Sequence, residues 1–187
     1  MGRAKQTERV KTQLRANYVV VVADDFVVDV FHNGVYVPDS KRRPMLDRFG
    51  ASVERIDISV SEGDWLVFNV VNNRLRWGGA YYFAAAGCFG KDEFGFVSQL
   101  KTAGWSACDS PSDVQRFIGE RDYLRHQSAQ AVARPWHEGT KLKRKYAGAG
   151  WDGEPVWGTR RNTWLKVVVS SQQKEVPQAA KKKRRTD

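Results

Sequence analysis

The sequence contains few of the residues from which metal centres are built. Among its 187 residues there are two cysteines and three histidines, and the histidines are widely scattered. Neither cysteine belongs to a Cys-x-x-Cys pair, so the two cysteines do not make a zinc site by themselves. The sequence therefore offers no zinc motif.

Long apolar runs are also missing. The chain has no stretch of about twenty apolar residues, so we expect no membrane span. The N-terminal segment, MGRAKQTERVKTQLRAN, lacks the apolar block of a secretory signal. The protein is therefore either intracellular or numbered from the residue after a removed leader, and both alternatives stay open.

Catalytic motifs are incomplete wherever they begin. The segment 104–108, GWSAC, starts like the nucleophile elbow of a hydrolase but has Cys108 where that turn requires a second glycine. The segment 148–153, GAGWDG, has the spacing Gly-x-Gly-x-x-Gly, but no strand pattern precedes it and Pro155 follows. No two of the 21 acidic residues stand out as a glycosidase pair. We therefore expect a protein that is not an enzyme.

The two cysteines, Cys88 and Cys108, admit two interpretations. In an oxidising compartment they could close a disulfide loop worth roughly 3 kcal/mol in chain-entropy terms. In a reducing compartment they would remain two buried thiols. The sequence favours neither interpretation.

What the sequence does contain is extended, β-branched segments separated by turn residues. The stretch 19–37 reads VVVVADDFVVDVFHNGVYV, in which Asn33 and Gly34 supply the positive φ angles of a tight hairpin turn. The segment 18–23 is apolar on both faces and should lie centrally, whereas 53–60 alternates and should be half exposed. The predicted strands are 18–23, 26–31, 53–60, 64–71, 80–86 and 164–169.

One helical signal interrupts this β pattern. Ser110, followed by Pro111 and three residues later by Asp113, is a reasonable N-terminal cap. The residues that would then share one face are Val114, Phe117 and Ile118. We predict a short helix inside a long crossover loop.

Several of these motifs resemble the galactose-binding-domain-like β-sandwiches of bacterial secreted proteins. The resemblance rests on the aspartates before Phe26, on the Asn-Gly turn and on the Glu-Gly-Asp turn at 62–64. It also includes Gly78-Gly79, the pair Pro135-Trp136 and a closing strand, and it covers roughly Tyr18 to Val169. The resemblance implies an all-β, jelly-roll-like β-sandwich that serves as a non-catalytic binding module.

We therefore predict one sandwich domain between two polar ends. Residues 1–16 form a polar N-terminal extension, residues 17–169 form the sandwich, and residues 170–187 form a disordered basic tail. The tail carries a cluster of five cations that could simply keep the chain soluble, serve as a nuclear-import signal or bind a polyanion. This cluster consists of Lys181, Lys182, Lys183, Arg184 and Arg185.

Asp24 and Asp25 also admit two interpretations. Sandwiches of the family that this chain resembles frequently hold a structural calcium ion in a loop at one end, and carboxylates suit that ion. No cofactor other than this calcium is expected. Alternatively, either aspartate accepts turn amides and so fixes the bend between two strands.

Aromatic residues in the second half of the chain are the better functional signal. An exposed ring can stack on a sugar, and neighbouring charges can bind its hydroxyl groups. The stacking candidates are Trp77, Trp136 and Trp151, with Arg74, Arg76 and Lys143 as polar partners. The ordinary alternative is that such rings belong to the core or pack beneath loops.

The net charge of +10 favours an acidic partner. Our first hypothesis is a non-catalytic carbohydrate-binding or surface-interaction module whose ligand is a polysaccharide or other glycan. The alternative is a structural subunit of a larger assembly, which its basic tail and aromatic loops hold to an acidic protein or a nucleic acid.

Overall fold

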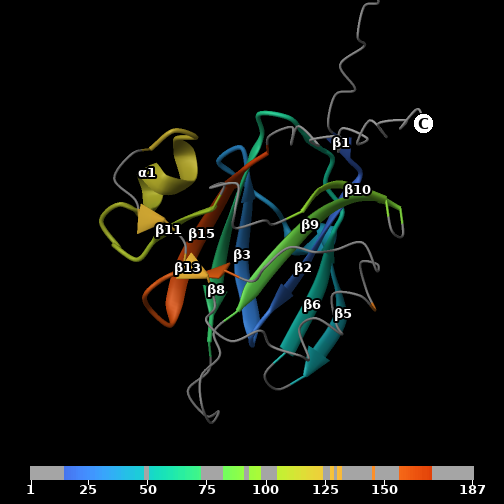
Figure 1. The fold of residues 1–187 in the computed structure, drawn as a ribbon, viewed down its shortest axis with the longest axis horizontal. Coiled ribbons are helices and arrows are strands. Elements are labelled where there is room, and N and C mark those ends of the chain that lie inside the picture. Colours follow the sequence, from blue (N-terminus) through green and yellow to red (C-terminus); the bar gives the residue numbers. More distant parts are fainter. Residues whose placement is uncertain are drawn as a thin grey trace, which may run out of the picture.

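The computed structural model shows two antiparallel β-sheets stacked face to face (Figure 1). It describes residues 15–48, 51–72, 82–90, 93–97, 105–123, 127–128, 130–131, 145 and 156–169. The predicted all-β sandwich is therefore confirmed.

The first sheet has the strand order β13-β14-β9-β2-β6-β5, with β10 paired to β9. Its strands are β2 (Tyr18–Ala23), β5 (Arg42–Arg48), β6 (Ala51–Ile56), β9 (Phe83–Gly90), β10 (Glu93–Val97), β13 (Gln130–Ala131) and β14 (Val156–Trp157). A separate small sheet pairs β1 (Arg15–Ala16) with β7 (Val60–Ser61).

The second sheet has the strand order β12-β11-β15-β8-β3-β4. Its strands are β3 (Phe26–His32), β4 (Val35–Tyr36), β8 (Trp65–Val71), β11 (Trp105–Cys108), β12 (Gln127–Ser128) and β15 (Asn162–Val168). The chain passes repeatedly from one sheet to the other, through β2, β3, β6, β8, β9 and β11 in turn. This alternation between sheets makes the sandwich jelly-roll-like.

Strand β2 lies at the centre of the first sheet, between β6 and β9. Val19, Val21 and Ala23 face the core between the sheets. Val20 and Val22 belong to a second buried cluster, on the opposite face of the strand. The prediction of a central strand covered on both faces is thus confirmed.

The predicted hairpin is present at Asn33 and Gly34, with φ angles of 53° and 78°. The turn joins β3 to β4, which pair through Phe31 with Tyr36 and through His32 with Val35. Positive φ at two consecutive positions is the reason that Asn-Gly suits this turn.

The predicted strand 53–60 is divided in the structure. Strand β6 ends at Ile56, and β7 begins only at Val60. The backbone leaves the ladder between them, where the amide of Ile58 donates to the carbonyl of Ile56 at 3.0 Å. Ile56, Ile58 and Val60 are nevertheless all buried in the core, as the alternation predicted.

The helix begins later than predicted. Helix α1 spans Val114–Gly119 with Asp113 at its N-cap, and the Asp113 side chain makes no capping hydrogen bond within the described part of the chain. Ser110 instead begins a turn, since its carbonyl accepts the amide of Asp113 at 3.1 Å. The Ser110 cap is therefore wrong, although Phe117 and Ile118 are buried as expected.

Helix α1 covers part of the outer face of the second sheet. In Figure 1 it lies beside β11 and β15, away from β5 and β6. Phe117 and Ile118 pack against Val67 and Cys108. The buried Nζ of Lys166 donates to the carbonyls of Phe117 and Glu120 at 3.0 Å each, which holds the C-terminal end of the helix.

Strand β1 pairs with β7 just before residue 17, where the predicted sandwich starts. Ala16 is 1% exposed in the core, and the amide of Asn17 donates to the carbonyl of Cys88 at 2.8 Å. Most of the predicted extension, residues 1–14, lies outside the described residues, and the domain boundaries stay a prediction. No helix in the described ranges is long and apolar enough to span a membrane.

Candidate functional site

The residues predicted to bind a glycan or a polyanion lie outside the described residues. They are Arg74, Arg76, Trp77, Trp136, Lys143, Trp151, Lys181, Lys182, Lys183, Arg184 and Arg185. Their roles stay predictions.

Three other aromatic residues, Tyr82, Trp105 and Trp157, are buried in the fold. The ring of Trp105 packs against Phe68 and Phe83, with centroids 6.1 and 5.5 Å away. Trp157 is buried and its Nε1 donates to the carbonyl of Arg160 at 2.7 Å. Tyr82 is buried and its hydroxyl donates to the carbonyl of Ala23 at 3.0 Å. These rings stabilise the fold and are closed to a ligand.

Asp24 and Asp25 form the buried turn between β2 and β3. Asp25 has a φ angle of 64°. The side-chain amide of Asn72 donates to Asp24, and the backbone amide of Asp24 donates to the carbonyl of Tyr82 at 2.9 Å. Within the described ranges, no three His, Cys, Asp or Glu residues come together as metal ligands. The observed contacts are those of a turn, and the calcium ion stays a prediction.

Cys88 and Cys108 are both free and buried. Cys88 belongs to the cluster on the outer face of the first sheet, whereas Cys108 lies beneath helix α1 on the outer face of the second. The two sheets separate the sulfurs, so the structure has two thiols and no disulfide. Burial raises the pKa of Cys88 to about 12, which makes it a poor nucleophile.

The exposed apolar side chains of the described part of the chain all lie along one edge of the sandwich. They are Phe26, Val28, Val35, Tyr36 and Met45, and they are between 38% and 69% exposed. Their strands, β3, β4 and β5, border the open side, because β4 and β5 are the terminal strands of the two sheets. We call these five residues the apolar edge.

Aromatic contacts support the upper part of the apolar edge, near the hairpin. Tyr36 meets Phe31 edge-on with 5.6 Å between ring centroids, and Phe31 in turn packs against Trp164 at 6.0 Å. The hydroxyl of Tyr36 donates to Asp39 at 3.4 Å. The ring is thus held in place while 45% of the residue remains exposed.

A bulge in β3 shapes the middle of the apolar edge. Val27 pairs with Val70, and Asp29 pairs with the adjacent Asn69, so Val28 is the extra residue. Such a bulge disrupts the ladder and redirects side chains. Val28 is accordingly 46% exposed although it lies in a strand of the sandwich.

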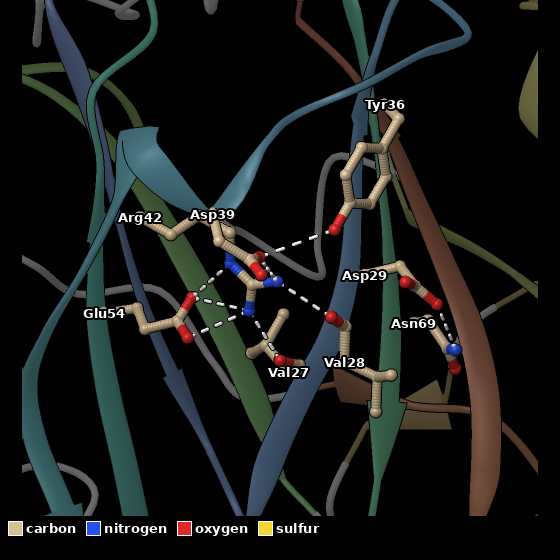
Figure 2. A network of polar contacts seen from close by, with 8 residues as sticks. All are labelled: Val27, Val28, Asp29, Tyr36, Asp39, Arg42, Glu54 and Asn69. Carbon is tan, nitrogen blue, oxygen red and sulfur yellow. Dashed lines mark hydrogen bonds and ion pairs between the residues drawn. The ribbon is translucent and has the colours of Figure 1, made fainter.

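Arg42 of β5 crosses the open side and holds this bulge (Figure 2). Its Nη2 donates to the carbonyl of Val27 at 2.6 Å, and its Nη1 donates to the carbonyl of Val28 at 2.8 Å. The same guanidinium binds Glu54 of β6, with Nε to Oε2 at 3.1 Å and Nη2 to Oε1 at 2.9 Å. One side chain therefore joins the edges of both sheets.

The Arg42–Glu54 pair is largely shielded from water. The side chains of Arg42 and Glu54 are only 8% and 17% exposed. A weaker contact reaches Asp39, whose Oδ1 lies 3.5 Å from Nη1 and whose side chain is 84% exposed. Planar, multidentate contacts of this kind require arginine, since lysine offers a single point charge.

A polar pair lies next to the bulge. The side-chain amide of Asn69 donates to Asp29 at 2.8 Å. The Oδ1 atom of Asn69 is buried and has no hydrogen-bond partner among the described residues. Figure 2 shows both side chains over β8, on the side of β3 away from Arg42.

Asp64 organises the hairpin end of the sandwich. It accepts hydrogen bonds from the Asn33 side chain at 2.9 Å and from the Ser61 amide at 2.8 Å, and it lies 3.0 Å from Nε2 of His32. Burial alone would raise the pKa of Asp64, but these hydrogen bonds outweigh it and lower the pKa. The cluster anchors the turn that presents Val35.

Sequence reasoning missed the apolar edge and Arg42. The available signal was the apolar run Phe26–Val28 at the start of β3, because successive residues of a strand point to opposite faces and only one face of this sheet meets the core. For Arg42 the signal was weak, because proline is rare inside strands and Pro44 stands two residues after it. The proline is tolerated there because β5 lies at the edge of its sheet and its ladder is irregular between Pro44 and Leu46.

Comparison with known proteins adds no relative. No family model, curated protein or solved structure matches the chain.

Proposed function

We propose that the protein is a non-catalytic surface-interaction module that binds an acidic protein through the apolar edge. The observation that carries this proposal is the gathering of the exposed large apolar side chains of the described part on three neighbouring strands. Exposed apolar residues scattered singly are normal, whereas a group on one surface is typical of an interaction site.

The composition of the apolar edge suits a protein partner. Phe26 and Tyr36 offer large rings, and aromatic residues dominate the energetics of protein interfaces. The guanidinium of Arg42 and the Phe31 ring hold the surface in one conformation, which lowers the entropic cost of binding. A partner that covers this surface must itself present apolar side chains.

Charge favours an acidic partner over a second copy of the chain. The formal net charge is +10, so two copies repel each other. Lys41 and Arg43 are exposed beside the apolar edge, and the Arg43 side chain is 70% exposed despite its ion pair with Asp57. Cations at the rim of an interface mainly raise the rate of association with an acidic partner.

Binding of a glycan is the second candidate function, and one observation favours it. The half-exposed ring of Tyr36 lies beside the carboxylate of Asp39, and an aromatic ring with a neighbouring hydrogen-bonding group can hold a sugar. The resemblance to galactose-binding-like modules supports the same candidate.

Site-specific photocrosslinking tests the proposed function. Val35 is replaced by a benzophenone-bearing amino acid in the full chain, which is then irradiated in the cells that normally produce it. The control carries the same group at Gln115, which is exposed on helix α1. We expect an adduct with an acidic protein from position 35 and none from position 115.

The captured protein is then purified and its binding is measured directly. We expect Tyr36→Ser to weaken the dissociation constant about tenfold or more, as for a residue at the centre of an interface, and Gln115→Ser to leave it unchanged. Equal losses from both substitutions would overturn the assignment of the apolar edge. Adducts only with other copies of the chain, or only with glycans, would overturn the acidic protein as partner.

A further inference from the structure

We infer that the apolar edge is closed to the addition of a β-strand and that Arg42 is the residue that closes it. This inference rests on the proposed function, because it specifies how the partner binds there. The partner is held by side-chain contacts, and its backbone does not extend either sheet.

The backbone of β3 would otherwise be open along this side. Strand β4 pairs with β3 only at Phe31 and His32. No other described strand neighbours the first part of β3 on that side. An open edge of this kind normally recruits another strand through its unpaired carbonyl and amide groups.

Three carbonyl groups of this stretch are already engaged. Arg42 occupies the carbonyls of Val27 and Val28, and the amide of Val37 donates to the carbonyl of Val30 at 2.8 Å. Because Val28 is the bulged residue, the spacing of the ladder is also broken where a new strand would begin. An incoming strand therefore finds these three acceptors occupied and no regular register.

The edge of the first sheet is protected in a second way. Strand β5 carries Pro44, which has no amide hydrogen, and its pairing with β6 is irregular between Pro44 and Leu46. Strands β3 and β5 on the open side thus resist pairing, while side chains of both remain exposed. This combination favours docking through side chains.

Arg42 is also the positioning residue of the surface. Glu54 fixes the position of the Arg42 guanidinium. The guanidinium can then bind both carbonyls of the bulge only when the bulge has the conformation seen here. That conformation places Val28 on the surface. Without the guanidinium, the carbonyls of Val27 and Val28 become acceptors for another strand.

The test removes the guanidinium without leaving a buried charge. The variant Arg42→Gln with Glu54→Gln is compared with the wild-type chain by sedimentation velocity over a range of concentrations. The control is Arg116→Gln with Glu120→Gln, which removes an Arg–Glu pair of the same type from the surface of helix α1. We expect larger, concentration-dependent species from the first variant alone.

A third substitution identifies the route of this association. Adding Val28→Lys to the Arg42 and Glu54 variant places a charge on the open strand, which blunts edge pairing. We expect the wild-type sedimentation profile to return. Persistent association in this triple variant would overturn strand pairing as its cause and, with it, the role assigned to Arg42.

Circular dichroism establishes that each variant is folded. If the double variant unfolds, Arg42→Lys decides the matter, since it keeps a charge opposite Glu54 but cannot fork to both carbonyls. A folded variant that sediments like the wild-type chain overturns the inference. The sedimentation experiment needs no partner protein. The crosslinking experiment can therefore refute the proposed function while the closed edge stands, and sedimentation can refute the closed edge while the proposed function stands.

Discussion

Replacing Arg42 by alanine is the perturbation whose size the structure defines best. The change removes hydrogen bonds to two backbone carbonyls and leaves Glu54 without its guanidinium partner. Hydrogen bonds to a charged group contribute roughly 1.5 to 3 kcal/mol each, and breaking a buried ion pair costs about 3 to 5 kcal/mol.

These contributions overlap and do not add in full. The Glu54 side chain is 17% exposed, so water reaches part of the carboxylate once the arginine is gone. We therefore expect the free energy of unfolding to fall by about 3 kcal/mol, the lower end of the range for a buried pair. A domain with a total stability of about 5 to 15 kcal/mol should remain folded after such a loss.

A double-mutant cycle separates the pair from its surroundings. The Arg42→Ala, Glu54→Ala and combined variants are unfolded in urea, and tryptophan fluorescence follows the transition. We expect the combined loss to be smaller than the sum of the single losses, because each single change strands a charge or a set of acceptors. The control Arg116→Ala, in an exposed pair, should hardly move the midpoint.

A loss of less than about 1 kcal/mol for Arg42→Ala would refute this reasoning, because that is the range of exposed ion pairs. Additive losses in the cycle would likewise show that Arg42 and Glu54 do not act together. Either result would remove the physical basis for treating Arg42 as the residue that holds the β3 bulge.

Three further predictions concern the core, the hairpin end and the edge. A Cβ at Gly158 would lie 2.0 Å from Oγ1 of the buried Thr163, so Gly158→Ala should cost about 1 to 3 kcal/mol, and an unchanged melting temperature would contradict this packing. Because the pKa of Asp64 is lowered in the folded protein, its carboxylate stabilises the fold at pH values above the ordinary pKa of 3.8, and this contribution is lost as the pH falls below that value. Asp64→Asn should therefore flatten the acid dependence of the melting temperature. A profile identical to that of the wild-type chain would count against the cluster. Trp157→Ala should cost about 3 to 5 kcal/mol in urea unfolding because the ring is buried, whereas Val35→Ala should change stability by less than about 0.5 kcal/mol; similar losses from both would reverse these placements.

Features that depend on near neighbours in the chain were predictable. The β-branched run of β2 and the positive φ angles of Asn33 and Gly34 are local properties, and the structure has both where they were predicted. The face of α1 that carries Phe117 and Ile118 was also predictable, because helical periodicity places these two residues together. Its starting residue was not, because the turn at Ser110 competes with a cap.

The burial of individual tryptophans was not predictable, because rings in similar local sequence have different surroundings. Trp157 stands among glycine and charged residues, like several rings predicted to bind a ligand, yet it lies in the core between the two sheets. Trp164 lies in an apolar strand, but its ring is on the outer face of the second sheet, where it packs against Phe31. The neighbours of each ring come from distant strands.

By itself, then, the sequence determined the fold class, the central strand and the hairpin, since backbone preference and alternating hydrophobicity act over a few residues. Only the tertiary structure decided that the exposed apolar side chains gather at one edge and that Arg42 holds it. The pairing of β5 with β6 places the Arg42 guanidinium, and the bulge in β3 where it pairs with β8 places the carbonyls of Val27 and Val28. Both are needed for the guanidinium to meet the two carbonyls. Glu54, Val28 and Val27 are 12 to 15 positions from Arg42 in the chain, so no local pattern of residue types specifies their meeting with it.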